Sequence, residues 1–191
     1  MKRVILGAVL AGFAVFIWGM VSHMLLPIGE IGVKMMPNES AVVEIMKENI
    51  TTPGVYLFPG FDTRQAGSKE AEAAWSKKYE AGPNGFLVYQ PQGTIPLNPF
   101  SFLWELLASV MGALLAGFIV FKSGAERYWC KVGTVTFMGL FAWITISIPY
   151  WNWYRFPGNF TFSQGIDEVV GWFVAGLVIA WIVKPKEPEQ A

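Results

Sequence analysis

Two ionisable residues lie inside long apolar stretches of this sequence and are the first candidates for chemistry. His23 lies near the end of the stretch "VILGAVLAGFAVFIWGMVSHMLLP", and Glu105 lies near the start of the apolar stretch that follows Pro99. Ionisable side chains are costly in a bilayer, and where they occur they bind ligands or pair with one another. Both are expected at similar depth, with Glu168 as a further member of a polar cluster.

The pair has two interpretations. In the functional one, His23 is an axial ligand for haem or chlorophyll, or a hydrogen-bond partner of a quinone, and Glu105 orients its second ring nitrogen. In the structural one, which we favour because the site lies near water, a hydrogen bond between His23 and Glu105 ties two spans together. A bis-histidine haem is excluded because the chain has one histidine.

No catalytic motif is found in the sequence. The patterns HExxH, GxSxG, GxGxxG and the P-loop are all absent. Cys130 is the only cysteine, which excludes an internal disulfide and a cysteine-based zinc or iron–sulfur site. We therefore expect neither an enzyme nor a metal site.

Composition indicates a membrane protein. Of the 191 residues, 53% are hydrophobic and only 15% are charged, and the apolar residues are gathered in long uninterrupted runs. The 14 basic residues balance the 14 acidic ones, so nothing suggests a nucleic-acid partner.

Four apolar runs are long enough to span a bilayer as helices. We expect transmembrane helices at residues 1–26, 100–121, 132–150 and 166–183, with a tail at 184–191. The expected first turn of the last helix contains Asp167 and Glu168, whose charge suits the positive end of a helix dipole.

The distribution of Lys and Arg in the short loops and tails predicts the orientation of the chain. Short loops that carry most of the Lys and Arg residues lie in the cytoplasm, and Arg155 is the only such base on the other side of the membrane. Both termini are therefore expected in the cytoplasm and residues 27–99 outside it. The bases on the cytoplasmic side are Lys2, Arg3, Lys122, Arg127, Lys131, Lys184 and Lys186.

Residues 27–99 contain one pattern twice, a helix followed by a Pro-Gly break and a short strand. The helices are capped by Asn38 or Ser40 and by Ser68, and strand 55–58 is expected to pair with strand 86–89. The predicted fold is thus all-α within the membrane, with four transmembrane helices and a small extracytoplasmic α+β cap between the first and second. Such a cap buries little, so it leans on the spans or on a partner.

The segment 151–165 is predicted to be an outer loop that is unusually aromatic. The stretch "PYWNWYRFPGNFTF" places Trp151, Trp153, Tyr154 and Phe156 close together. An aromatic belt at the headgroup level explains most of this composition. The alternative is that these four side chains contact a neighbouring membrane subunit or a flat pigment or quinone.

Small residues recur at spacings of four and permit close approach between helices, either within the chain or toward a partner. The pairs are Gly7 with Ala11, Ala8 with Gly12, Ala113 with Gly117, and Gly171 with Ala175.

The first third of the chain resembles a group of known membrane-protein sequences. The stretches "VFIWGMVSHMLLPIG", "MPNESAVVEIMKENI" and "PGVYLFPG" resemble the N-terminal pattern of a group of small bacterial four-span membrane proteins without an assigned activity. The resemblance implies a bacterial inner membrane, and it implies no site residue.

We expect a non-catalytic accessory subunit of a larger membrane assembly of respiratory or photosynthetic type. Its partners would be other membrane subunits and lipid, contacted through the spans, the cap and the aromatic loop. The alternative is a membrane protein that binds a cofactor, a quinone or a lipid through His23 and Glu105. No cofactor of its own is expected in the first case; haem, chlorophyll or quinone contact belongs to the second.

Overall fold

Residues 1–185, the part of the chain that this computed structural model describes, contain six α-helices, two short strands, one π-helical turn and two short 3-10 helices. The chain divides into two compact units. The bundle unit comprises Met1–Val33, Pro96–Asn152 and the described residues from Phe156 onward, and the cap unit comprises Lys34–Ile95 and Trp153–Arg155. The expected tail at 184–191 lies outside the described residues from Lys186 onward.

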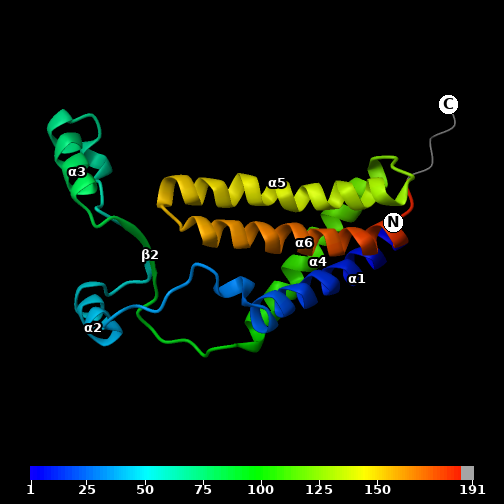
Figure 1. Ribbon diagram of the computed structural model, residues 1–191, viewed down its shortest axis with the longest axis horizontal. Helices are drawn as coiled ribbons and strands as arrows, with labels where there is room; N and C mark the ends of the chain where they lie inside the picture. The colour runs from blue at the N-terminus through cyan, green and yellow to red at the C-terminus, as the bar shows by residue number, and fades with distance from the viewer. Residues whose placement is uncertain (186–191) are drawn as a thin grey trace. The chain divides into compact units, whose positions relative to one another are not determined.

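Four helices of the bundle unit are long and apolar enough to cross a membrane. They are α1 (Lys2–Met20), α4 (Pro99–Lys122), α5 (Tyr128–Tyr154) and α6 (Gly158–Ile182). In Figure 1, α5 and α6 run side by side, and α1 and α4 run obliquely to them. A π-helical turn, Val21–Leu25, continues α1 without a break. The fold is therefore mostly helical, as the apolar runs of the sequence predict.

Helix α1 runs antiparallel to α4 and to α6, and α5 runs antiparallel to α6, because in each pair early residues of one helix contact late residues of the other. The start of α1 and the end of α6 consequently lie at the same end of the unit. Between α1 and α4 the contacting pairs are Val4 with Gly117 and Gly12 with Val110. Between α1 and the end of α6 they are Gly7 with Val183 and Trp18 with Gly171, and between α5 and α6 they are Val132 with Gly176 and Trp143 with Gly165.

Small residues form the centre of this packing. All eight residues of the spaced pairs in α1, α4 and α6 are buried. Within the described residues the core adds branched side chains at the same contacts, among them Val4, Val120, Val135 and Ile179. The close-approach motifs are thus used within the chain, and not left open for a partner.

Helix α5 is attached to α6 by three hydrogen bonds from side chains to main-chain oxygens. Tyr128 Oη donates to Leu177 O at 3.0 Å, Lys131 Nζ to Val183 O at 2.9 Å, and Trp143 Nε1 to Thr161 O at 2.8 Å.

The aromatic segment 151–165 is not a loop, and this corrects the prediction. Helix α5 continues through Pro149 to Tyr154, and only three residues separate it from α6. Arg155 adopts a φ of 60° and ends α5, and the fixed backbone of Pro157 begins α6.

The early start of α6 also corrects the expected place of the acidic pair. Asp167 and Glu168 lie well inside α6 and not in its first turn. The argument from the helix dipole therefore does not apply to them, because that effect falls off within the first turn.

The cap unit contains α2 (Glu39–Asn49), β1 (Gly54–Phe58), α3 (Lys69–Ala81) and β2 (Gly85–Tyr89). The two strands pair, as predicted, and the pairing is antiparallel with Val55 opposite Val88. Ser68 caps α3 by accepting a hydrogen bond from Ala71 N, whereas Asn38 precedes α2 without a side-chain cap.

No residue from Lys34 to Ile95 is fully buried. The best-anchored side chain is Trp75 of α3, whose Nε1 donates to Pro59 O at 3.0 Å and whose ring contacts Phe61 and Tyr79. A unit of this kind has no core of its own, because burial of apolar surface is the main stabilising term in folding.

Candidate functional site

A cavity of about 440 Å³ lies between α1, α4 and α6 in the bundle unit. His23, Glu105 and Glu168, the three residues of the predicted polar cluster, all line it, together with Asp167. Apolar and aromatic side chains complete the wall, among them Phe16, Trp18, Phe102 and Trp172.

The local sequence explains why His23 stands at the rim of this cavity. Pro27 disfavours helical geometry at the preceding residue, and Leu26 is accordingly extended. The helix closes with a wider turn in which Leu26 N donates to Val21 O at 2.9 Å. Gly29 then passes so close to the imidazole that any Cβ there would overlap the ring, and this contact holds His23 in place.

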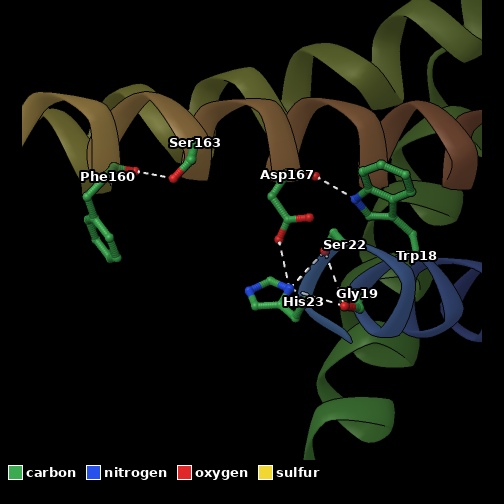
Figure 2. A network of polar contacts seen from close by, with 7 residues as sticks. All are labelled: Trp18, Gly19, Ser22, His23, Phe160, Ser163 and Asp167. Atoms are coloured by element: carbon green, nitrogen blue, oxygen red, sulfur yellow. Dashed lines mark hydrogen bonds and ion pairs between the residues drawn. The ribbon is translucent and has the colours of Figure 1, made fainter. Parts of the chain in front are cut away.

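One nitrogen of His23 is held by its own helix. Nδ1 lies 2.8 Å from Ser22 Oγ and 3.1 Å from Gly19 O, as Figure 2 shows. The Gly19 carbonyl only accepts, so its contact with Nδ1 is a hydrogen bond in the tautomer that carries the hydrogen on Nδ1. In the neutral ring, Nε2 is then the basic nitrogen, and in Figure 2 it points away from these contacts. The His23 side chain is 48% exposed.

The carboxylate nearest to His23 is Asp167, not Glu105, and this corrects the expected hydrogen bond between His23 and Glu105. Asp167 Oδ2 lies 3.8 Å from Nδ1, a distance that suits an ion pair with a protonated ring but is too long for a hydrogen bond. The tie between spans therefore joins α1 to α6. Glu105 of α4 contributes to the cavity wall and does not orient the ring.

Two tryptophans fix the acidic segment of α6. Trp18 Nε1 donates to Asp167 O at 3.1 Å, and Trp172 Nε1 donates to Glu168 Oε2 at 3.0 Å. The other carboxylate oxygen of Asp167, Oδ1, is buried and has no hydrogen-bond partner in the described chain. This is an unusual state, because nearly all buried polar atoms are hydrogen-bonded.

Sequence reasoning did not identify Asp167, Trp18 or Trp172 as site residues. The Pro-Gly pair at 157–158 is a helix-start signal, and it would have placed Asp167 at mid-helix. Only the packing of α1 on α6 shows the hydrogen bond of Trp18, whereas Trp172 and Glu168 are four residues apart in one helix, a spacing that the sequence itself offers.

Chemically, the arrangement suits ligand binding. Among the described residues, no group of three or more His, Cys, Asp or Glu side chains has the geometry to hold a metal ion. The wall instead combines a basic nitrogen, carboxylates and aromatic faces, which is the mixture of apolar surface and few polar groups found in small-molecule sites.

None of the four aromatic residues predicted as contacts in segment 151–156 lines this cavity. Trp151 and Trp153 are exposed at the end of α5, and the Tyr154 ring lies 5.0 Å from Phe86 within the cap unit. Phe156 packs against Tyr150 and Phe160 and lines a smaller cavity of about 280 Å³.

Comparison with protein-family models, with curated proteins and with solved structures gives no match to this chain.

Proposed function

We propose that this chain is an integral membrane protein that binds a small amphiphilic molecule in the cavity between α1, α4 and α6. The observation that carries the proposal is the position of His23 in the wall of this cavity, where Nδ1 is held by Ser22 and Gly19 and the neighbouring wall residues are carboxylates and aromatic side chains. A ring held in this way has little rotational freedom left to lose when a ligand binds.

Filling the cavity tests the proposal. Gly19 lines the cavity, and a Cβ added there meets no atom within 4 Å, so Gly19→Phe places a large side chain in the cavity without a backbone clash. Gly133→Phe is the matched control, because Gly133 is also helical and also has open space around it but does not line the cavity.

The measurement is mass spectrometry of small molecules retained by the protein after purification in mild detergent. We expect a molecule that is present in the wild type and in Gly133→Phe and is depleted at least about tenfold in Gly19→Phe. Equal retention in all three proteins, or no retained molecule in any, would contradict a ligand-binding role for the cavity.

A second candidate function is the non-catalytic accessory subunit of a larger membrane assembly. Two observations favour it: the cap unit has no fully buried residue, and only 17% of the most apolar window of α5 is buried within the chain. Surfaces of this kind are stabilised by contact with other subunits or with lipid.

Native gel electrophoresis of gently solubilised membranes tests the subunit role. We expect the chain to migrate in a large assembly, and replacement of Trp151, Trp153 and Tyr154 together by Ala to release it. The control is the replacement of Trp129 and Trp181 by Ala. Both residues are exposed, Trp129 at the start of α5 and Trp181 at the end of α6, and their replacement is expected to leave migration unchanged. Migration of the wild type as a small species argues against the subunit role.

For the placement in the membrane, we propose a bacterial inner membrane with both termini in the cytoplasm and the cap outside. The positive charge at one end of the bundle supports this orientation. Cys130, the only cysteine, is exposed near that end, so a membrane-impermeant maleimide is expected to label it only after the membrane is permeabilised. Labelling of intact spheroplasts would reverse the orientation.

A further inference from the structure

The cavity between α1, α4 and α6 is rich in negative formal charge and in hydrogen-bond acceptors. Glu105, Asp167 and Glu168 come from two different helices and line the same space. Among the described residues that line it, none is Lys or Arg. A ligand that supplies donors and positive charge therefore complements the wall.

The wall offers few donors in return. The indole N–H groups of Trp18 and Trp172 are already bonded to a main-chain oxygen of α6 and to Glu168. In the neutral ring with its hydrogen on Nδ1, that hydrogen is directed at the helix of His23 itself, and the amide of Gln164 is then the remaining side-chain donor of the wall. A quinone, whose two carbonyl oxygens need donors, fits this wall poorly.

Asp167 is the least compensated of the three carboxylates. Its Oδ1 is buried without a partner, and its Oδ2 has only the 3.8 Å contact with His23. A carboxylate taken out of water requires hydrogen bonds or an opposite charge, and within the described chain Asp167 has only the imidazole of His23 at 3.8 Å, which is charged only when protonated. If the Asp167 side chain rotates toward the cavity, it gains a hydrogen-bond donor only when a bound ligand supplies that donor.

The rest of the cavity suits a cation that carries an apolar tail. The rings of Trp18, Trp172 and Phe102 line the space, and aromatic faces attract cations. Glu105 lies roughly 9 Å along α4 from its first residue, since each helical residue rises about 1.5 Å. The acidic wall is therefore near the end of the span, at a depth that a lipid-like head group reaches while its tail stays in the apolar region.

From these observations we propose that the cavity binds a primary ammonium group carried on an apolar tail. Asp167 and Glu105 accept hydrogen bonds from the ammonium, and the rings of Trp18 and Trp172 pack against it. The inference rests on the proposed function and names the ligand class of the same cavity.

The test compares two amphiphiles that differ only in the head group, dodecylammonium and dodecanol. The full chain is reconstituted in phosphatidylcholine nanodiscs, which contain no primary amine, and binding is measured by isothermal titration calorimetry with empty nanodiscs as the blank. We expect the ammonium to bind at least about tenfold more tightly than the alcohol, because hydrogen bonds to charged groups are the strong ones.

Two charge-neutral variants locate the effect. Asp167→Asn and Glu105→Gln are each expected to weaken dodecylammonium binding about tenfold or more and to leave dodecanol binding unchanged. Glu126→Gln, which removes an exposed carboxylate in the segment between α4 and α5, is the control and changes neither. Measuring both carboxylate variants keeps the test informative if one of them fails to fold.

The outcomes separate this inference from the proposed function. Equal affinity for the two amphiphiles, with both lost in Gly19→Phe, would overturn the ammonium ligand and retain the ligand-binding cavity. Failure of the wild type to bind either probe would overturn both. Loss of dodecylammonium binding in Glu126→Gln to the same degree would show a general charge effect and overturn the site.

A last arm distinguishes two sources of the ammonium group. Nanodiscs that contain phosphatidylethanolamine present it as a lipid head group, and a free long-chain amine presents it in solution. Weaker dodecylammonium binding in the phosphatidylethanolamine nanodiscs identifies the lipid as a competitor for the site. Unchanged binding identifies the free amine as the ligand that fits.

Discussion

Lys131 is a buried cation in a helix that is otherwise apolar, and its surroundings give it a structural role. Only 6% of the residue is exposed, and its Nζ donates to Val183 O. Val183 follows the last turn of α6, where the final main-chain carbonyls lack partners within the helix and form the negative end of its dipole. Lys131 of α5 therefore caps the C-terminus of its neighbour.

Replacing this lysine is expected to destabilise the bundle unit. Lys131→Met keeps the apolar stem but removes the donor, so we expect the free energy of unfolding to fall by about 1–3 kcal/mol, the cost of an unsatisfied buried polar group. Chemical unfolding of the protein in detergent micelles measures it. The control Lys184→Met alters an exposed side chain and is expected to change stability by less than about 0.5 kcal/mol. An equal effect of the two variants would argue against a cap.

At the scale of the helices, the contact between α1 and α4 depends on Gly12. A Cβ added to Gly12 would lie 2.5 Å from the Cα of Val110, so the two helices would have to separate. In a bilayer, helix association relies on close packing because lipid tails are as apolar as the side chains. The small residue is thus what allows the two backbones to approach.

The smallest substitution tests this contact. Gly12→Ala is expected to lower the free energy of unfolding by about 1–3 kcal/mol, as other overpacked core positions do. Gly133→Ala is the control, since nothing lies within 4 Å of its added Cβ, and it is expected to be neutral or to stabilise α5 by about 0.5–1 kcal/mol. Equal stability of Gly12→Ala and the wild type would show that α1 and α4 adjust freely.

For the molecule as a whole, the two units differ in how much they bury. Fully buried residues occur in α1, α4, α5 and α6, whereas the cap unit has none among residues 34–95. Local stability follows the number of buried apolar contacts and the shielding of hydrogen bonds. The cap is therefore expected to open more readily than the bundle unit when the chain is isolated.

Hydrogen exchange of the purified chain measures this difference. Amides of β1 and β2 are expected to exchange on the order of a hundredfold or more faster than those at the centre of α1. The same measurement on the chain in its native membrane extract serves as the comparison, and slower exchange of the cap there would reveal a partner. Equal protection of cap and bundle in the isolated chain would contradict the missing core.

Local features of the sequence determined the elements. The length of each apolar run predicts the four long helices, and the Pro-Gly breaks with short apolar runs predict the hairpin, because both depend on residues close together in the chain. The boundary near Pro149 was wrong for the same reason. The predicted boundary at residue 150 follows the end of the apolar run, but the helix itself continues through Pro149 to Tyr154.

The partner of His23 was decided only by the tertiary structure. The sequence places Glu105, Asp167 and Glu168 at comparable depth, and each is an equally good partner for a histidine. Successive helical residues point about 100° apart, so the rotation of α6 against α1 determines that Asp167, and neither Glu168 nor Glu105, lies nearest to the ring. That rotation is set by contacts such as Trp18 against Gly171, which join residues far apart in the chain.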